Sequence, residues 1–224
     1  MDTLPDNGQL LLLDKPREWT SFDVVKQVKK HLKGKKVGHA GTLDPLATGL
    51  LLICTGKQTK TIPVLQDAEK EYTGTITIGI ETPSFDLETI PEQQWDFAHV
   101  TSDMVNSAVD KLTGEISQVP PMHSAIKLNG KRAYELARKG ETAELKSRLV
   151  TIRVFEITRL ELPEIDFRIV CTKGTYIRSI ARDLGRLLGM GATLTALRRT
   201  RIGNYKVEDA LSIEQLRLKY PLVQ

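Results

Sequence analysis

Residues 38–49 read GHAGTLDPLATG, a stretch rich in chain-turning residues that carries a single acidic side chain, Asp44. Three glycines and Pro45 interrupt regular structure, so we predict a loop over residues 36–48. Proline also removes a main-chain donor and fixes the chain direction just after the acid. A rigid loop with one acid near its tip often presents a catalytic carboxylate. The alternative is an Asx-type turn, in which Asp44 binds only nearby main-chain groups.

The surroundings of Asp44 are apolar, and no lysine or arginine lies between Lys36 and Lys57. A carboxylate in such surroundings is costly unless a group from a distant part of the chain pairs with it. If Asp44 is ionised, its basic partner must therefore come from far away in the sequence.

Apolar and alternating patterns on both sides of the loop predict strands and helices in an irregular order. Strands are expected over residues 9–14, 50–55, 72–80, 150–160 and 166–172. Helices are expected from Thr20 or Ser21 to Gly34, over residues 101–112 and over residues 176–188. Because no regular β-α-β repeat is present, we predict an α+β fold with a mixed or antiparallel central sheet and flanking helices. The whole chain, residues 1–224, is expected to form one domain.

Charge is strongly segregated along the chain, although the net charge is only +4. Residues 26–36 contain six lysines and no acid, whereas residues 81–110 contain seven acids and no lysine or arginine. Residues 117–150 carry seven basic residues against three acids, and we expect an exposed basic insertion with a short helix near residues 133–138. Such a chain can present a basic face to a polyanion, although solvated helix faces are the plainer alternative. To the acidic segment we assign no role beyond structure.

Composition and the placement of apolar residues limit the cellular compartment and the class of protein that we expect. Hydrophobic residues make up 40% and charged residues 27%, which is typical of globular proteins. The aliphatic run from Leu10 to Leu13 is too short for a signal-peptide core or a membrane span. Cys54 and Cys171 lie in apolar runs without partners at metal-binding spacing, which predicts buried thiols in a reducing compartment. We therefore expect a cytoplasmic protein without a metal site.

Five segments resemble motifs of the TruB family of tRNA pseudouridine synthases, and they occur in the family's order. They are LLLLDKPREWTSFDVV from residue 10, GHAGTLDPLATGLL from residue 38, KEYTGTITIG from residue 70, VPPMHSAIKLNGKRAYELARKG from residue 119, and CTKGTYIRSIARDLGRLLGMGATLTALRRTRIG from residue 171. The resemblance implies a pseudouridine synthase catalytic fold, with residues 117–150 as a thumb-like RNA clamp. It implies conversion of uridine 55 to pseudouridine in the T loop of tRNA, without a cofactor, and we expect a monomer. Many members continue into a PUA domain, but only about twenty residues follow Arg201, so we expect no complete PUA domain here.

Carried over position by position, the resemblance assigns three catalytic residues. Asp44 is the catalytic carboxylate, Tyr72 stacks on the flipped base, and Arg178 pairs with Asp44. The resemblance places substrate-binding roles on His39, Tyr176, Leu197 and Lys15, and RNA-backbone contacts on Lys127, Lys131, Arg132, Arg198, Arg199 and Arg201.

The chemistry of the implied reaction agrees with these roles. The N1–C1′ bond must break, the base must turn over, and C5 must join C1′, with no redox change. Asp44 can act as nucleophile on the sugar or as the base that removes the 2′ proton, and both roles need it ionised, which the fork of Arg178 would favour. Flipping a stacked uridine out of the T loop costs about a few kcal/mol. His39 and Tyr72 are suitable residue types to fill the gap and to stack on the extruded base.

Plainer interpretations stay open for single residues and for the whole chain. Tyr72 fits an ordinary strand aromatic, His39 a loop histidine, and Arg178 a helix-surface arginine. The chain can also be a non-catalytic tRNA-binding or RNA-folding module on the same scaffold, although such a protein has no use for an acid facing RNA. A glycoside-cleaving enzyme usually needs two carboxylates flanking the bond, and the sequence offers one good candidate.

Overall fold

The computed structural model of the chain describes residues 8–32, 36–124, 126–128, 130–137, 139–141, 143 and 145–222. The chain divides into two compact units, and we describe each by itself. Unit 1 is Met1–Thr73 together with Leu197–Gln224, and unit 2 is Gly74–Ala196. Strands β4 (Lys70–Ile78) and β12 (Ala192–Ile202) each contribute residues to both units. The prediction of one catalytic domain over residues 1–224 stays a prediction.

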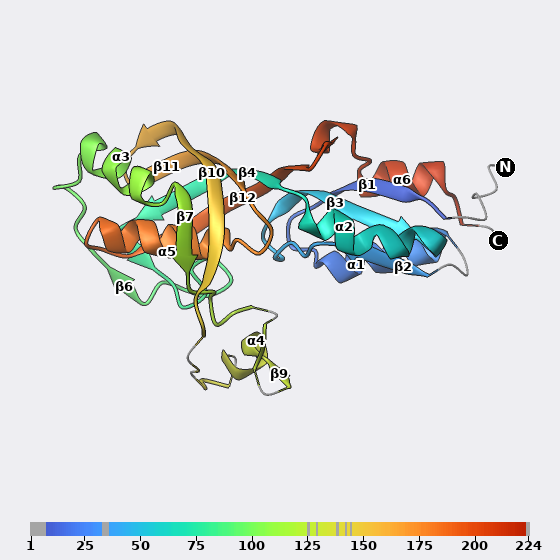
Figure 1. Ribbon diagram of the computed structural model, residues 1–224, viewed down its shortest axis with the longest axis horizontal. Coiled ribbons are helices and arrows are strands. Elements are labelled where there is room, and N and C mark those ends of the chain that lie inside the picture. Colours follow the sequence, from blue (N-terminus) through green and yellow to red (C-terminus); the bar gives the residue numbers. More distant parts are fainter. Residues whose placement is uncertain are drawn as a thin grey trace. The chain divides into compact units, whose positions relative to one another are not determined.

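Unit 1 is built around one strand, β3 (Thr48–Thr55), with neighbours on both edges (Figure 1). Along one edge β3 pairs antiparallel with β1 (Leu10–Lys15). Its other neighbours are β2 (Val37–Ala40), which pairs antiparallel, and β12, which pairs in parallel with the start of β3. The remaining elements of unit 1 are α1 (Ser21–His31), η1 (Gly56–Thr61), α2 (Ile62–Asp67), β13 (Tyr205–Lys206), η2 (Val207–Asp209) and α6 (Ile213–Lys219).

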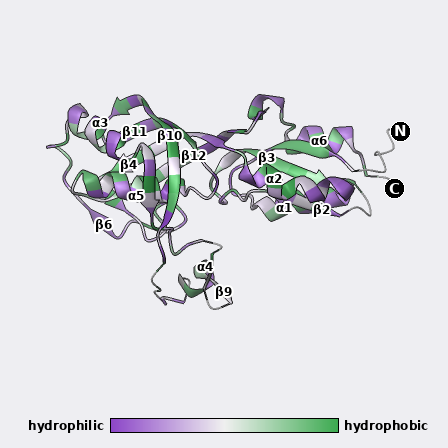
Figure 2. Ribbon diagram, viewed as in Figure 1, coloured by the Kyte–Doolittle hydropathy of each residue, from purple (hydrophilic) through white to green (hydrophobic). Residues whose placement is uncertain are grey.

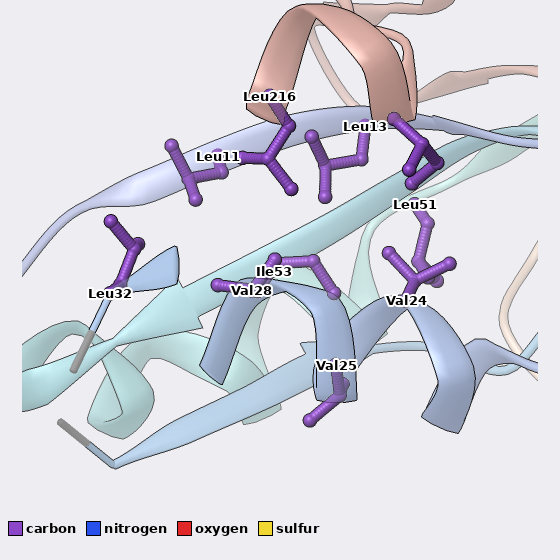
Figure 3. Close-up of a cluster of buried hydrophobic side chains, with 10 residues drawn as sticks. Leu11, Leu13, Val24, Val25, Val28, Leu32, Leu51, Ile53 and Leu216 are labelled. Atoms are coloured by element: carbon purple, nitrogen blue, oxygen red, sulfur yellow. The ribbon is translucent and has the colours of Figure 1, made fainter. Parts of the chain in front are cut away.

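Both faces of β3 are buried, as its unbroken apolar sequence predicts. Successive side chains of a strand point to opposite faces, and here each face has its own hydrophobic cluster. Leu51 and Ile53 meet side chains of β1, α1 and α6 (Figure 3). Leu50 and Leu52 pack on the other face with Ile202 and other apolar residues. Figure 2 accordingly colours β3 as hydrophobic along most of its length, and the predicted strand over residues 50–55 is confirmed.

Helix α1 begins where the sequence predicts. Thr20 caps it through its side chain, which accepts a hydrogen bond from the main-chain N–H of Asp23, and the Asp23 carboxylate accepts from the main-chain N–H of Thr20 in return. Such a reciprocal capping box satisfies N–H groups that the first turn leaves unpaired. The valines of the predicted apolar positions, Val24, Val25 and Val28, are buried. The predicted stop at Gly34 lies outside the described residues.

Unit 2 carries the rest of the sheet, in the order β12-β4-β11-β10-β7. Strand β10 (Arg148–Glu161) is antiparallel to β11 (Glu164–Cys171) and to β7 (Gly114–Gln118). Short strands β5 (Ile80–Glu81) and β6 (Gln93–Gln94) form a separate pair, and helices α3 (Ser102–Lys111) and α5 (Ile177–Leu187) complete the framework. The predicted α+β fold with a mixed, largely antiparallel sheet is confirmed, together with the two helices of this unit.

The basic insertion leaves the sheet between β7 and β10. It contains an antiparallel pair, β8 (Lys127–Leu128) with β9 (Lys131–Arg132), followed by the short helix α4 (Ala133–Ala137) (Figure 1). The predicted helix is therefore confirmed up to residue 137, and residue 138 lies outside the described residues. The side chains of Lys127, Lys131 and Arg132 also lie outside the described part of the structure, so their phosphate contacts stay predictions.

Two further sequence predictions concern thiols and membranes. Cys54 and Cys171 are buried thiols, as predicted. None of the described helices is long and apolar enough to cross a membrane.

Candidate functional site

The loop that carries Asp44 is shorter than predicted. Residues 37–40 are not loop but the strand β2, whose Gly38 and His39 pair with Cys54 and Ile53 of β3. Gly38 was misread as a turn residue. A Cβ at this position would lie 2.8 Å from Cδ1 of Ile62 in α2, so the glycine serves close packing. The connection between β2 and β3 is therefore residues 41–47, which we call the Asp44 loop.

Main-chain and side-chain hydrogen bonds hold the Asp44 loop to helix α1. The carbonyl of Asp44 accepts from the N–H of Ala47 at 3.1 Å, which closes a turn around Pro45. The Ser21 hydroxyl accepts from the N–H of Leu43 at 2.9 Å and lies 3.2 Å from the Leu43 carbonyl. Leu43 and Ala47 are buried while Asp44 is partly exposed. The acid thus sits on a fixed main chain, with its side chain at the boundary between core and solvent.

Lys15, the last residue of β1, lies fully buried behind this loop. Its ammonium donates to the carbonyls of Trp19, Pro16 and Pro45 at 2.6, 3.0 and 3.1 Å. Burial lowers the pKa of Lys15 to about 8, although the nearby Asp44 carboxylate acts in the opposite direction. Lys15 therefore holds the main chain of the residue that follows Asp44, and its role in the site stays a prediction.

The structure contradicts the RNA-backbone contact that the sequence analysis assigned to Arg199. Its side chain in β12 is only 1% exposed, and its guanidinium donates to the carbonyls of Leu50, Thr42 and Gly41 at 2.8, 3.3 and 3.2 Å. The run of basic residues from Arg198 to Arg201 hid this burial, because neighbouring residues of a strand face opposite sides and Arg198 and Arg199 need not share one environment. A phosphate cannot reach a guanidinium that is buried beneath its own loop.

The other two arginines of β12 are partly exposed and already paired. Arg198 forms a bidentate pair with Asp14, with the shorter contact at 2.7 Å, and its side chain is 40% exposed. Arg201 lies 3.1 Å from Glu69. Both can turn toward a phosphate only by weakening these pairs, and their contacts with RNA stay predictions.

Three further predicted site residues lie in unit 1. Tyr72 in β4 is 9% exposed, and Leu197 in β12 is partly buried, with its carbonyl 3.5 Å from the Thr48 hydroxyl. His39 lies in β2, and burial lowers the pKa of its imidazole below the usual value, only partly opposed by a hydrogen bond with the main chain of Gly41. His39 is therefore a strand residue at the edge of the Asp44 loop, and its ring is favoured in the neutral form.

Arg178 in unit 2 is buried, at 3% exposure, and not on the helix surface. It lies in the first turn of α5, where its Nε lies 3.4 Å from a carboxylate oxygen of Asp86. Its terminal nitrogens donate to the carbonyls of His123 at 2.9 Å and Ser84 at 3.3 Å. Asp86 belongs to the acidic segment to which the sequence analysis gave no role in the site, because nothing in the sequence links an acid to an arginine 92 residues later.

Tyr176 caps the same helix and is fixed on both sides. Its main-chain N–H and carbonyl bind the side-chain amide of Gln118 at 2.8 and 3.2 Å. The guanidinium of Arg148 lies 4.6 Å from the centre of its ring, a distance typical of a cation–π contact. Arg148 also donates to the carbonyl of Gly174. Tyr176 and Arg178 are thus both held by contacts within unit 2.

The predicted site residues therefore fall into two groups. Lys15, His39 and Arg199 come together around the Asp44 loop in unit 1, and Tyr176 and Arg178 come together in unit 2. The predicted pair between Asp44 and Arg178 joins the two units and stays a prediction. Among the residues that the structure describes, no group of three or more His, Cys, Asp or Glu side chains could hold a metal ion.

Comparisons with known proteins cover nearly the whole chain. The sequence model described as "TruB family pseudouridylate synthase (N terminal domain)" matches residues 29–177, and that described as "tRNA pseudouridylate synthase B C-terminal domain" matches residues 178–223. A protein of Flavobacterium johnsoniae named tRNA pseudouridine synthase B is 55% identical over 213 residues, or 92% of this chain and 93% of its own. One of the same name from Phocaeicola vulgatus is 51% identical, over 92% of this chain and 91% of its own.

Solved structures agree with the sequence comparisons. A chain in the crystal structure of a Cbf5-Nop10-Gar1 complex matches with a TM-score of 0.73 and 31% identity over 93% of this chain. A chain of an archaeal box H/ACA sRNP Nop10-Cbf5 complex matches with a TM-score of 0.71 and 27% identity over 96% of this chain. The present chain spans only 53% and 54% of the length of those two chains.

Proposed function

This chain belongs to the TruB family of pseudouridylate synthases, and we propose on that premise that it isomerises uridine 55 to pseudouridine in the T loop of tRNA. The coarser part of the proposal, formation of pseudouridine in tRNA, is supported by relatives of that name at 55% and 51% identity. The finer part, the position in the T loop and the mechanism, is supported by the motif around Asp44.

One observation carries the assignment of the active site. Asp44 is partly exposed, yet the main chain on both sides of it is fixed by buried groups, Ser21 and Arg199 before it and Lys15 after it. A catalytic group must be reachable by its substrate and held in one geometry. A surface acid without a catalytic role needs neither condition.

The proposed reaction balances without an external reagent. The N1–C1′ bond breaks, the base turns over, and a bond forms between C5 and C1′. The proton originally on C5 leaves to solvent, and N1 gains a proton. Asp44 acts either as the nucleophile on C1′ or as the base that removes the 2′ proton, and in both roles it is ionised. The guanidinium of Arg178 pairs with it and keeps the negative charge favourable.

The remaining residues handle the extruded nucleotide. A uridine stacked in a folded loop must be flipped out. Tyr72 stacks on the flipped base, Leu197 and Tyr176 pack against the nucleotide, and the neutral ring of His39 enters the vacated stack. Basic residues of the insertion and Arg198 contact RNA phosphates, since RNA of this kind is recognised by shape and splayed-out bases more than by groove sequence.

The test is release of tritium from a T-arm stem-loop that carries [5-³H]uridine, together with carbodiimide mapping of the product. The wild-type protein is expected to release tritium and to place pseudouridine at position 55. Asp44→Asn is expected to lower the rate at least about 10³-fold while RNA affinity changes less than about tenfold. Asp209→Asn, an exposed acid of the same unit, serves as control and should remain active. Full activity in Asp44→Asn would remove Asp44 from the mechanism and leave an RNA-binding module as the simpler interpretation.

A further inference from the structure

We propose that Arg199 is a positioning residue, whose buried guanidinium sets the position of the Asp44 carboxylate by holding the main chain that precedes it. The inference rests on the proposed function, because it assigns Asp44 to the reaction. It replaces the phosphate contact that the sequence suggested for this residue.

Arg199 contacts the start of the Asp44 loop and the strand that follows the loop. One terminal nitrogen donates to the carbonyl of Gly41 at 3.2 Å and the other to that of Thr42 at 3.3 Å. The Nε group donates to the carbonyl of Leu50 at 2.8 Å, beyond the loop in β3. One rigid, planar fork therefore joins the entry of the loop to the strand at its exit. A lysine, whose donors all radiate from one nitrogen, cannot reproduce this planar fork.

The sheet explains why this residue can reach the loop. Strand β2 leaves the edge of β3 at Ala40, and β12 takes up the same edge in parallel at the pairs Arg198–Thr48 and Arg199–Gly49. The Asp44 loop begins where β12 replaces β2 as the partner of β3. Arg199 lies at that junction, directly opposite Gly49, and its side chain turns under the loop.

Lys15 completes the arrangement from the other side of the acid. Its ammonium holds the carbonyl of Pro45, the residue after Asp44, at 3.1 Å. Two buried cations thus hold the carbonyls of residues 41, 42 and 45 while Asp44 stays partly exposed between them. Burying a charged group is costly unless its hydrogen bonds are satisfied, and an apolar side chain would fill the same core more cheaply. The use of two cations here is explained if the geometry of the loop matters for catalysis.

A purely architectural role for Arg199 predicts a different result. If the guanidinium only joined β2, β3 and β12, its loss would lower stability but leave the rate of each folded molecule unchanged. If it positions Asp44, the rate of the chemical step falls even in fully folded protein. A displacement of about 1 Å in a catalytic group can cost about 10²-fold in rate. RNA affinity is expected to change little, because Arg199 is buried and does not reach the RNA.

The experiment compares single-turnover tritium release at saturating T-arm RNA for the wild type, Arg199→Lys and Arg199→Gln, with rates expressed per folded molecule. The folded fraction is measured by circular dichroism and RNA affinity by filter binding in the same buffer. Leu216→Ala is the matched control, since it removes a fully buried side chain of the same unit without removing a hydrogen bond of the Asp44 loop. Both Arg199 variants are expected to lose about 10²-fold in rate with Kd within about threefold, whereas Leu216→Ala keeps its rate per folded molecule.

Each other outcome overturns the inference. Arg199 variants with the rate of the control show that the residue is architectural, and so does a failure of both variants to fold. A loss confined to Kd would restore the phosphate contact. An inactive wild type is a distinct result, because it refutes the proposed function itself, whereas an active wild type with equally active Arg199 variants refutes only the positioning role.

Discussion

The Asp44 loop of unit 1 and the Arg178 environment of unit 2 hold their charged groups in opposite ways. Around Asp44, the buried cations Lys15 and Arg199 bind main-chain carbonyls, so the backbone is fixed and the carboxylate is partly exposed. Around Arg178, the guanidinium itself is held by Asp86 and by two carbonyls, and the whole side chain is buried. Unit 1 therefore fixes the main chain that carries the Asp44 carboxylate, whereas unit 2 fixes the guanidinium of Arg178 itself.

Under the proposed function, the difference follows from the demands on each residue. A carboxylate that attacks or deprotonates a sugar must remain open to the substrate, so only its main chain can be constrained. A guanidinium that orients this carboxylate needs no contact with bulk water, and direct hydrogen bonds can preorganise it. The comparison predicts that substitutions of Arg178 act on the reaction directly, whereas substitutions below Asp44 act through the loop.

The largest effect is expected for Arg178→Lys, which breaks the guanidinium side of the comparison. A point charge cannot replace the fork that binds Asp86, two carbonyls and, in our proposal, Asp44. We expect kcat to fall about 10²–10³-fold, measured by single-turnover tritium release. Arg186→Lys, an exposed arginine of the same helix, is the control and should keep its rate. A near-normal rate for Arg178→Lys would show that no catalytic pair with Asp44 is formed.

The next effect is a loss of stability on substitution of Gly49, which follows the Asp44 loop in β3. Gly49 has a φ of 103°, and a Cβ there would lie 2.3 Å from the carbonyl oxygen of Arg199. Gly49→Ala should therefore lower the free energy of unfolding by about 2–5 kcal/mol through strain and overlap. Gly114→Ala separates the two causes, since Gly114 has a similar φ of 93° with no atom within 4 Å of its Cβ position. Equal losses in urea denaturation would mean that overlap with β12 contributes nothing.

Removal of the acid that holds Arg178 should have a slightly smaller effect. Asp86→Asn removes a buried carboxylate 3.4 Å from the buried guanidinium of Arg178, and the free energy of unfolding should fall by about 3 kcal/mol. We also expect kcat to fall about tenfold as Arg178 loses its fixed orientation. Glu92→Gln, an exposed member of the same acidic segment, is the reference. If the two variants unfold at the same denaturant concentration, Asp86 does not hold Arg178 in solution.

The pH dependence of stability tests the burial of Lys15. The pKa of Lys15 is lowered from 10.5 to about 8 by burial. Below pH 8 both folded and unfolded chains keep this proton. Between these two pKa values the unfolded chain binds it more strongly. The free energy of unfolding should therefore rise with pH in this window by up to about 1.4 kcal/mol per unit, relative to Lys15→Met. Parallel curves for the two proteins between pH 8 and 9.5 would contradict the lowered pKa.

The smallest effect is expected for Arg198→Gln, which tests whether the exposed neighbour of Arg199 contacts RNA. Arg198 must leave its pair with Asp14 to reach a phosphate, so its loss should weaken RNA binding by only about threefold. The slope of log Kd against log salt should fall by less than about one unit. Lys219→Gln, an exposed residue of α6, is the control. An unchanged salt slope would assign Arg198 to the pair with Asp14 alone.

Local patterns predicted most of the secondary structure, because the periodicity of β3, α1 and α5 is carried by adjacent residues. The Leu50–Thr55 run is short and almost entirely apolar, which is typical of a buried strand. Gly38 was misread as a turn residue, because a glycine that packs closely against α2 looks the same in the sequence as a glycine that a turn requires. Strands β2 and β12 were not predicted from the sequence, and the side on which each of their residues is buried depends on their neighbours in the sheet.

The sequence by itself determined the family, the fold class and the acid at the centre of the proposed site, since these are carried by contiguous motifs. Only the tertiary structure decided that Arg199 lies buried beneath the Asp44 loop and that Asp86 holds Arg178. Arg199 acts on residues more than 140 positions earlier, and Asp86 lies 92 positions before its partner. Packing of segments far apart in the sequence sets such contacts, and no local periodicity records them.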